Sequence, residues 1–287
     1  MRWTTGHRSE NVEDVRSRSG GRLVRRGVPI GLGGLLLLVA LSFLTGQDFL
    51  SLVGGPGAPD EVMVPGGAAP TGPPAATTAE EERAVDMVHA TLDDLQESWA
   101  SELGGRYEPA RLVLFRDAIE SACGFAESAT GPFYCPGDRK VYLDVGFFDE
   151  LRSRFGAPGD FAQAYVIAHE VGHHVQHVLG IEARVRQLQQ ARPSQAKTLS
   201  VQMELQADCL AGAWARSANR YVSLEAGDIE AGLQAAAAIG DDRIQRMAGR
   251  RVSPDSFTHG SSAQRVEAFR SGLAGRAAAC GLSASAP

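Results

Sequence analysis

Cysteine is scarce in this sequence: only four occur in 287 residues, and no two are spaced as CxxC. A structural zinc site built on thiolates is therefore disfavoured, because such sites use closely spaced cysteine pairs. In an oxidising compartment, an even number of cysteines favours disulfides. We expect Cys123 to pair with Cys135, because these residues flank a short turn-rich loop, and Cys209 to pair with Cys280. Four buried thiols are the alternative.

The chain also lacks an excess of basic charge, since its formal net charge is −6 at pH 7. Residues 1–27 hold seven arginines against three acidic residues, a net charge of +4, so the rest of the chain carries −10. Proteins that bind nucleic acid contact its phosphates with clustered Lys and Arg. The acidic main part of the chain therefore indicates that nucleic acid is not a partner.

The first 80 or so residues lack a pattern that could build a packed core. They divide into a basic N-terminal segment (1–27), an apolar segment (28–45) and a Gly/Pro/Ala-rich linker (46–78), which predicts a partly extended tether. Residues 79–287 remain as one globular domain of roughly 200 residues, which is ample for a sizeable core.

The apolar segment 28–45 (VPIGLGGLLLLVALSFLT) contains no charged residue. As a helix it would span roughly 27 Å, enough for the core of a bilayer. Arg22, Arg25 and Arg26 precede it, so the positive-inside rule predicts a cytoplasmic N-terminus and an extracytoplasmic main domain. A cleaved signal peptide is the alternative. The long polar segment before the apolar run, and the lack of a clean small-x-small cleavage site, favour a retained single-pass helix in the cytoplasmic membrane.

Hydrophobic periodicity in the main domain predicts many helices and few strands. The helices are expected at residues 79–103, 147–155, 160–179, from near 194 to 217, 228–239 and 262–273. Short strands rich in β-forming residues are expected at 111–115 and 140–144. Such a mixture predicts an α+β domain with a small β-sheet beside the helices.

The helix expected at 160–179 contains the sequence AYVIAHEVGHHVQHVLG. His169 and His173 are four residues apart, so both side chains leave one face of the helix and can bind one ion. Two neutral imidazoles suit Zn²⁺, and the adjacent Glu170 can take a proton from a zinc-bound water. A chance match is the alternative, but the helical context and the preceding apolar run YVIA argue against it. His174 and His177 are expected to be structural or to line the pocket, because a further helical ligand would overfill a catalytic site.

A third ligand is expected from the segment MELQADCLAGAWA. A metzincin would have a third histidine at position 179, and Leu179 excludes that class. Glu204 would instead complete a His₂Glu set and leave the fourth position to water. Asp208, one helical turn later, could accept a hydrogen bond from the remote N–H of a ligand imidazole. The alternative, two solvated helix charges, is disfavoured by the apolar neighbours of both residues.

A developing oxyanion needs a further hydrogen-bond donor. We take His259 in FTHGSSAQR as the first candidate catalytic donor, with Arg265 and Tyr165 less favoured; a capping or packing role for His259 is equally open. An extended substrate could pair with an edge strand near Val141–Asp144.

The stretches GPFYCPGDRKVYLD, FFDEL and YVIAHEVGHHVQHVLGI, within residues 131–181, resemble the bacterial neutral zinc metallopeptidase family, which belongs with the gluzincin-type zincins. The similarity continues through ELQADCLAGAWA, through DSFTHGSSAQRV at 255–266 and in the arginine-rich N-terminal segment. The resemblance implies a zincin-like, mostly helical catalytic domain and one zinc ion. It also implies Glu170 as the catalytic base and, as zinc ligands, His169, His173 and Glu204. It does not indicate a substrate.

We therefore expect a membrane-anchored zinc metallopeptidase that hydrolyses peptide bonds of a peptide or protein substrate. A membrane-tethered binding or scaffold protein stabilised by zinc is one alternative, although a structural site would normally fill its fourth position with a protein ligand. A metal-dependent amidase acting on non-peptide or cell-wall amides is another. The sequence predicts neither the cleavage specificity nor the oligomeric state.

Overall fold

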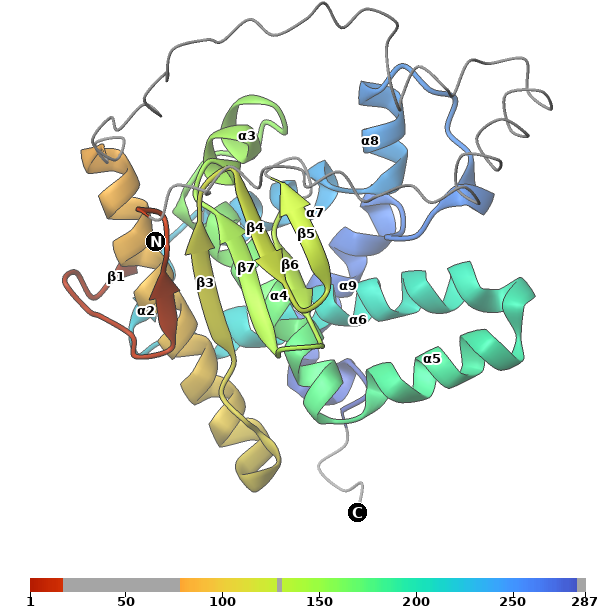
Figure 1. Cartoon of the computed structure of the whole chain (residues 1–287), viewed down its shortest axis with the longest axis horizontal. Helices are drawn as coiled ribbons and strands as arrows, with labels where there is room; N and C mark the ends of the chain where they lie inside the picture. Colours follow the sequence, from red (N-terminus) through yellow and green to blue (C-terminus); the bar gives the residue numbers. More distant parts are fainter. Residues whose placement is uncertain (18–77, 128–130, 283–287) are drawn as a thin grey trace, which may run out of the picture. The chain divides into compact units, whose positions relative to one another are not determined.

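The computed structural model describes residues 1–17, 78–127 and 131–282 (Figure 1). The membrane helix expected at 28–45 and nearly all of the linker expected at 46–78 lie outside these residues. Among the helices of the described ranges, none has the length and apolarity that a bilayer crossing requires.

Two of the long helices, α2 and α9, begin at residues that cap helix N-termini. α2 (Ala79–Leu103) follows Thr78, whose hydroxyl accepts a hydrogen bond from the Glu81 N–H, and acidic residues fill its first turn, where they complement the helix dipole. α9 (Ser262–Ala279) begins with a capping box at Ser261. The other helices are α3 (Phe147–Ser153), α4 (Asp160–Val178), α5 (Ile181–Ala191), α6 (Ala196–Ser217), α7 (Asp228–Ala238) and α8 (Asp241–Met247).

A four-stranded sheet has the strand order β2-β3-β7-β6. The strands β2, β3 and β7 run parallel, and β6 runs antiparallel to β7. Their bounds are β2 (Val12–Asp14), β3 (Arg111–Phe115), β7 (Lys140–Asp144) and β6 (Phe133–Cys135). Two further pairs are β1 (Arg2–Trp3) with β8 (Val222–Ser223), and β4 (Ala118–Ser121) with β5 (Gly124–Glu127).

The expectation that Val141–Asp144 forms an edge strand is wrong, because this segment belongs to β7, an inner strand that pairs with β3 along its whole length and with β6 over residues 140–142. The edge next to β7 is formed by β6, which has only three residues, and β2 forms the opposite edge. Stacking of Phe133 on Tyr142 and the disulfide at Cys135 hold β6 in place. A strand this short carries no usable alternation, so its pattern in the sequence did not reveal it.

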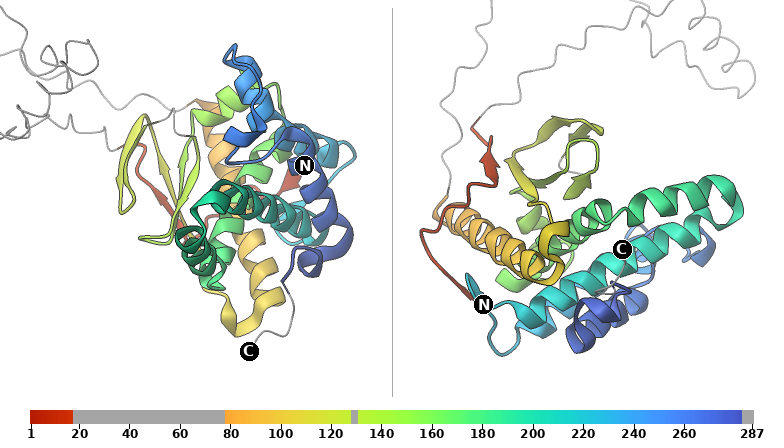
Figure 2. Two further views of the ribbon diagram at one scale, coloured as in Figure 1. Left: turned by 90° about the vertical axis from the view of Figure 1, so that its right-hand side faces the viewer. Right: turned by 90° about the horizontal axis from the view of Figure 1, so that it is seen from below.

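The α+β fold class is confirmed, with helices predominating and packed on one face of the sheet (Figure 2). Alternate residues of β3 face two different clusters, as strand geometry requires. Leu112 and Leu114 pack with α2 and α4 in the main core, whereas Val113 and Phe115 face the side covered by the β4–β5 hairpin. Complete burial of a leucine contributes roughly 1.5–3 kcal/mol, so this core fixes the position of α4.

Residues 1–17 belong to the same compact unit as the described residues 78–127 and 131–282. β1 pairs with β8, β2 pairs with β3, and Arg16 bonds to Glu81 of α2 (2.6 Å). The expectation that the first 80 residues add nothing to a packed core is therefore wrong for residues 1–17. Two- and three-residue strands have no hydrophobic periodicity, and they form here because distant strands and α2 supply their partners.

Both expected disulfides are confirmed. Cys123–Cys135 ties the β4–β5 turn to the edge strand β6. Cys209–Cys280 ties α6 to the C-terminal end of α9 across 71 residues of sequence.

Candidate metal centre

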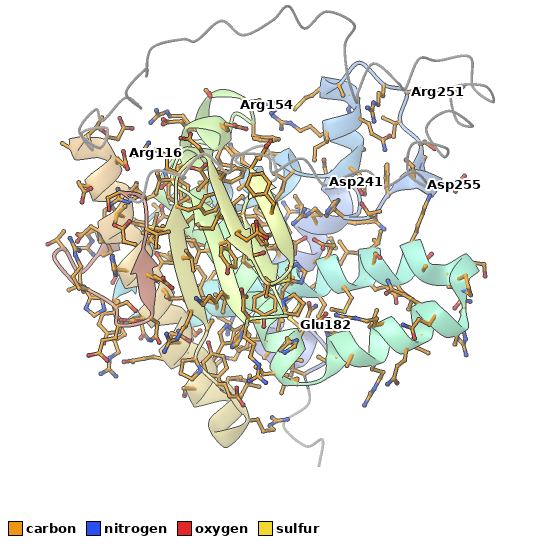
Figure 3. All side chains as sticks on the ribbon, viewed as in Figure 1. Arg116, Arg154, Glu182, Asp241, Arg251 and Asp255 are labelled. Atoms are coloured by element: carbon orange, nitrogen blue, oxygen red, sulfur yellow. A yellow bond between two sulfur atoms is a disulfide. The ribbon has the colours of Figure 1, made fainter. Side chains whose placement is uncertain are left out.

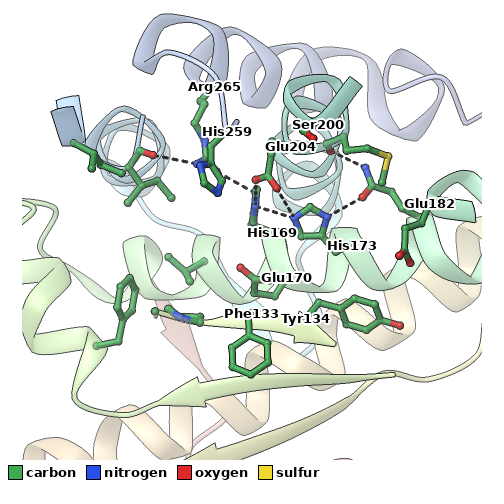
Figure 4. A pocket seen from close by; sticks show the side chains of 18 of the residues that line it. Phe133, Tyr134, His169, Glu170, His173, Glu182, Ser200, Glu204, His259 and Arg265 are labelled. Atoms are coloured by element: carbon green, nitrogen blue, oxygen red, sulfur yellow. Dashed lines mark hydrogen bonds and ion pairs between the residues drawn. The ribbon is translucent and has the colours of Figure 1, made fainter. Parts of the chain in front are cut away.

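The centre forms where α4 and α6 pack together. His169 and His173 leave one face of α4, and Glu204 of α6 meets them from the facing helix (Figure 4). The two Nε2 atoms are 3.2 Å apart; His169 Nε2 lies 3.2 Å from Glu204 Oε2, and His173 Nε2 lies 3.5 Å from Glu204 Oε1. One ligand atom from each residue lies within 4.8 Å of the other two.

Hydrogen bonds fix the orientation of both imidazole rings. His169 donates from Nδ1 to Asp208 Oδ1 (2.9 Å), and His173 donates from Nδ1 to Gln176 Oε1 (2.9 Å). The Gln176 amide nitrogen donates to the Met203 carbonyl and to a side chain of α6, so its oxygen must face His173. Both Nε2 lone pairs therefore point to the same place.

This donor set fits a zinc ion. Ligand nitrogens and oxygens 2.0–2.1 Å from a tetrahedral zinc ion are separated by about 3.3 Å, close to the separations seen here. Two imidazole lone pairs at this distance repel each other unless a cation lies between them. The three side chains can thus hold Zn²⁺ and leave one position open for a further ligand.

The electrostatics of the centre favour positive charge. Burial lowers the pKa of His169, but the carboxylates of Asp208 and Glu204 outweigh burial and raise it to about 10. Burial also lowers the pKa of His173, and Glu204 raises it by more. Burial raises the pKa of Glu204, whereas the two imidazoles hold it well below its usual range. A proton or a metal ion is therefore stabilised between these groups.

Glu170 lies beside the imidazole pair and lines the cavity that opens over the three candidate ligands (Figure 4). Its side chain is buried, and burial raises its pKa above the usual range despite the neighbouring imidazoles. A carboxylate with a raised pKa is better matched to accepting and returning a proton near neutral pH.

Asp208 is fully buried and accepts four hydrogen bonds. The donors are the Tyr165 hydroxyl, His169 Nδ1 and two nitrogens of Arg265. Tyr165 and Arg265, considered above as oxyanion donors, thus both bond to this carboxylate. Sequence reasoning missed this use of Arg265 and the contact of Gln176 with His173. The local sequence signal for the second contact was the position of Gln176, three residues after His173 and thus on the same side of the helix.

A cavity of about 860 Å³ opens over the centre, a size that suits an extended ligand. Phe133 and Tyr134 of β6 line it, together with an apolar wall formed by α3, the segment after α3, α4 and α8. This wall includes Phe147, Phe155, Val166, Ile244 and Met247. Polar residues of α5 and α6 complete it, among them Arg186, Gln189 and Ser200. Figure 3 shows Asp241 at the start of α8 and Glu182 at the start of α5, two helices that the sequence analysis did not predict.

His259 lines this cavity and is about half exposed. Asp241 holds the His259 loop: one carboxylate oxygen accepts the backbone N–H groups of residues 258–260, and the other lies 3.1 Å from His259 Nδ1. His174 is buried between Tyr134 and the Glu108 carbonyl. His177 Nδ1 lies 2.8 Å from Glu182 Oε2.

The chain is similar in sequence to one protein family and to bacterial relatives. A sequence model described as "Putative neutral zinc metallopeptidase" matches residues 1–282. "Uncharacterized protein YpfJ" of Escherichia coli K12 is 43% identical over 282 residues, which covers 95% of each chain. "Uncharacterized protein Mb2605" of Mycobacterium bovis is 42% identical over 208 residues, 68% of this chain and 69% of that protein. No solved structure matches the chain.

Proposed function

Because the chain belongs to the neutral zinc metallopeptidase family, we propose that it hydrolyses peptide bonds with one zinc ion held by His169, His173 and Glu204. The observation that carries the proposal is the convergence of these three donors at the floor of a cavity, with Glu170 beside them. A zincin-like arrangement of α4 under the sheet edge is part of the same proposal.

The bound ion supplies Lewis-acid chemistry, because zinc acidifies water and polarises a carbonyl group. Glu170 accepts the proton of the attacking water and returns it to the leaving amine. His259 donates a hydrogen bond to the substrate oxygen that gains negative charge, and Asp241 orients its ring. Asp208 keeps His169 in the tautomer that leaves Nε2 free for the ion.

The substrate extends along β6. An extended peptide can add to a sheet edge through backbone hydrogen bonds, and Phe133–Cys135 is the edge that borders the cavity. The apolar wall then receives a large apolar side chain of the peptide. Pairing with a sheet edge requires an extended peptide backbone, which a small non-peptide ligand lacks. This requirement supports a peptide or protein substrate.

Replacement of Glu170 by Gln tests the proposal. We expect wild-type protein to cleave casein or a peptide library, and Glu170→Gln to retain zinc while losing about 10²–10⁴-fold in rate. Glu102→Gln, an exposed carboxylate of α2, serves as the matched control and should cleave like wild type. Equal turnover by wild type and Glu170→Gln would remove the peptidase proposal.

The same assay separates the two alternatives. Zinc binding without turnover of any amide would favour a zinc-stabilised scaffold. Turnover restricted to cell-wall or other non-peptide amides would favour an amidase that uses the same residues.

A further inference from the structure

Arg265 of α9 is a buried cation close to the metal centre. Its side chain is 3% exposed, and its guanidinium is charged at any accessible pH. Nε donates to Asp208 Oδ2 (2.8 Å) and Nη2 donates to Asp208 Oδ1 (2.9 Å). Nη1 donates to the Ile239 carbonyl (3.2 Å), so the side chain also contacts the end of α7.

The guanidinium lies close to the ring that Asp208 holds. Arg265 Nη2 is 3.3 Å from His169 Nδ1 (Figure 4). The same atom is 3.4 Å from the Tyr165 hydroxyl. Three donors therefore share one oxygen of Asp208, and Arg265 alone bonds to the other. The direction of this carboxylate is set mainly by the two-point bond from Arg265.

Burial of this ion pair is not explained by stability alone. The desolvation of two charges commonly equals or exceeds their attraction, and an apolar pair of similar volume is often at least as stable. A fully desolvated Asp208 facing His169 without a cation would be an uncompensated charge. Arg265 neutralises that charge and leaves the carboxylate free to accept the His169 N–H.

We propose that Arg265 is a positioning residue of the metal centre: it fixes the Asp208 carboxylate, which in turn directs His169 Nε2 at the ion. The inference rests on the proposed zinc site. It gives α9 a role in the centre although α9 carries none of the three ligands. It also links the centre to the His259 loop, because His259 is six residues before Arg265.

The test compares zinc affinities, measured on the full chain by competition with a chromophoric chelator. Arg265→Lys keeps the positive charge but cannot form the two-point bond. We expect zinc to bind about 10- to 100-fold more weakly, the usual effect of losing a partner that orients a ligand. In cobalt-loaded protein, the visible absorption bands should change as well. Arg270→Lys, an exposed arginine on the same helix, is the matched control with wild-type affinity.

A double-mutant cycle identifies the route of the effect. If Arg265 acts through Asp208, then Arg265→Lys should weaken zinc binding much less when Asp208 is already Asn. If Arg265→Lys weakened zinc binding equally with Asp208 and with Asn at position 208, that result would overturn the inference. So would a folded Arg265→Lys protein with wild-type zinc affinity and an unchanged cobalt spectrum.

Tyr165→Phe covers the case in which Arg265→Lys does not fold. It removes one donor to the same Asp208 oxygen while keeping the ring in the core. A reduced zinc affinity is expected, and wild-type affinity would count against the positioning role of this carboxylate network. All these measurements concern binding, so a failure of peptide turnover in wild type would contradict the proposed function and leave the affinity comparison intact.

Discussion

Gly272 of α9 lies directly against the carbonyl oxygen of Cys209 in α6: a Cβ atom at position 272 would be 1.8 Å from that oxygen. The relationship is reciprocal, because a Cβ at Gly212 of α6 would be 2.0 Å from the Phe269 carbonyl oxygen of α9. The backbones of α6 and α9 are therefore in contact, and the disulfide from Cys209 joins the same helices. This contact sets the distance across which Arg265 reaches Asp208.

Gly272→Ala should separate α6 from α9. The methyl group would overlap backbone atoms that cannot move independently, and overpacking of this kind costs about 1–3 kcal/mol. We expect a lower midpoint in denaturant unfolding and weaker zinc binding. Gly105→Ala is the control, because nothing lies within 4 Å of a Cβ at that position. If Gly272→Ala were as stable as wild type, the backbones of α6 and α9 would have to be further apart than this contact implies.

Glu204→Gln should remove the response of the protein to zinc. A ligand that binds only the folded state stabilises it by about 4 kcal/mol at a thousand times its dissociation constant. We expect a chelator to lower the melting temperature of wild type, and zinc to restore it. Glu204→Gln should show neither effect, whereas Glu267→Gln, exposed on α9, should behave like wild type. A full zinc response in Glu204→Gln would exclude this residue as a ligand.

Asp242 should make stability depend on pH in acid. Burial raises the pKa of this carboxyl, but hydrogen bonds from Ser262 and the ion pair with Arg246 outweigh burial and lower the pKa to about 2. A carboxyl whose pKa is lower in the folded state stabilises that state at pH values above its unfolded-state pKa, which is near 4. This contribution is lost as the pH falls toward 2. It amounts to about 1–2 kcal/mol after allowance for solvent screening.

Asp242→Asn tests this contribution. The variant should be less stable than wild type at pH 7, and the two unfolding curves should converge as the pH approaches 2. Asp255→Asn, which removes an exposed carboxylate of a residue whose backbone carbonyl accepts a hydrogen bond from Lys197, should leave the difference in stability between pH 7 and pH 2 unchanged. A constant gap between wild type and Asp242→Asn at all pH values would mean that the carboxylate is not stabilised in its charged form.

Much of this fold could be predicted from local patterns in the sequence. The helix predicted at 79–103 coincides with α2, that at 160–179 is α4 with one residue more, and the strands predicted at 111–115 and 140–144 coincide with β3 and β7. These segments have strong periodicity or several consecutive β-forming residues. The imidazoles of His169 and His173 likewise converge through helical spacing alone.

Other features depend on partners that are distant in the sequence. The helix α5 has apolar residues at helical spacing (Ile181, Val185 and Leu188), but none of its residues is buried, and α8 has only seven residues. The strand β6 exists because β7 pairs with it, and the contact of Arg265 with Asp208 spans 57 residues. Contacts of this kind are set by tertiary packing, and a sequence pattern does not contain them.

The N-terminal strands set a condition on membrane topology. The predicted localisation places residues 1–27 in the cytoplasm and the main domain outside the membrane. A single crossing between residues 17 and 78 would separate β1 from β8 and β2 from β3, although these strands are paired in one folded unit. The strand pairings therefore predict that both segments lie in the same compartment.

A cross-link between β1 and β8 checks this prediction in membranes. Arg2 and Ser223 are partners in the antiparallel register, so the variant Arg2→Cys/Ser223→Cys should form a disulfide on mild oxidation of the full chain. Arg2→Cys with Arg270→Cys, an exposed position on α9, is the unpaired control and should not cross-link. In intact cells, an impermeant thiol reagent should then label Cys at positions 2 and 223 of the single variants alike. Labelling of only one of them, with no cross-link, would support the single crossing and show that the N-terminal strands do not join the domain in the cell.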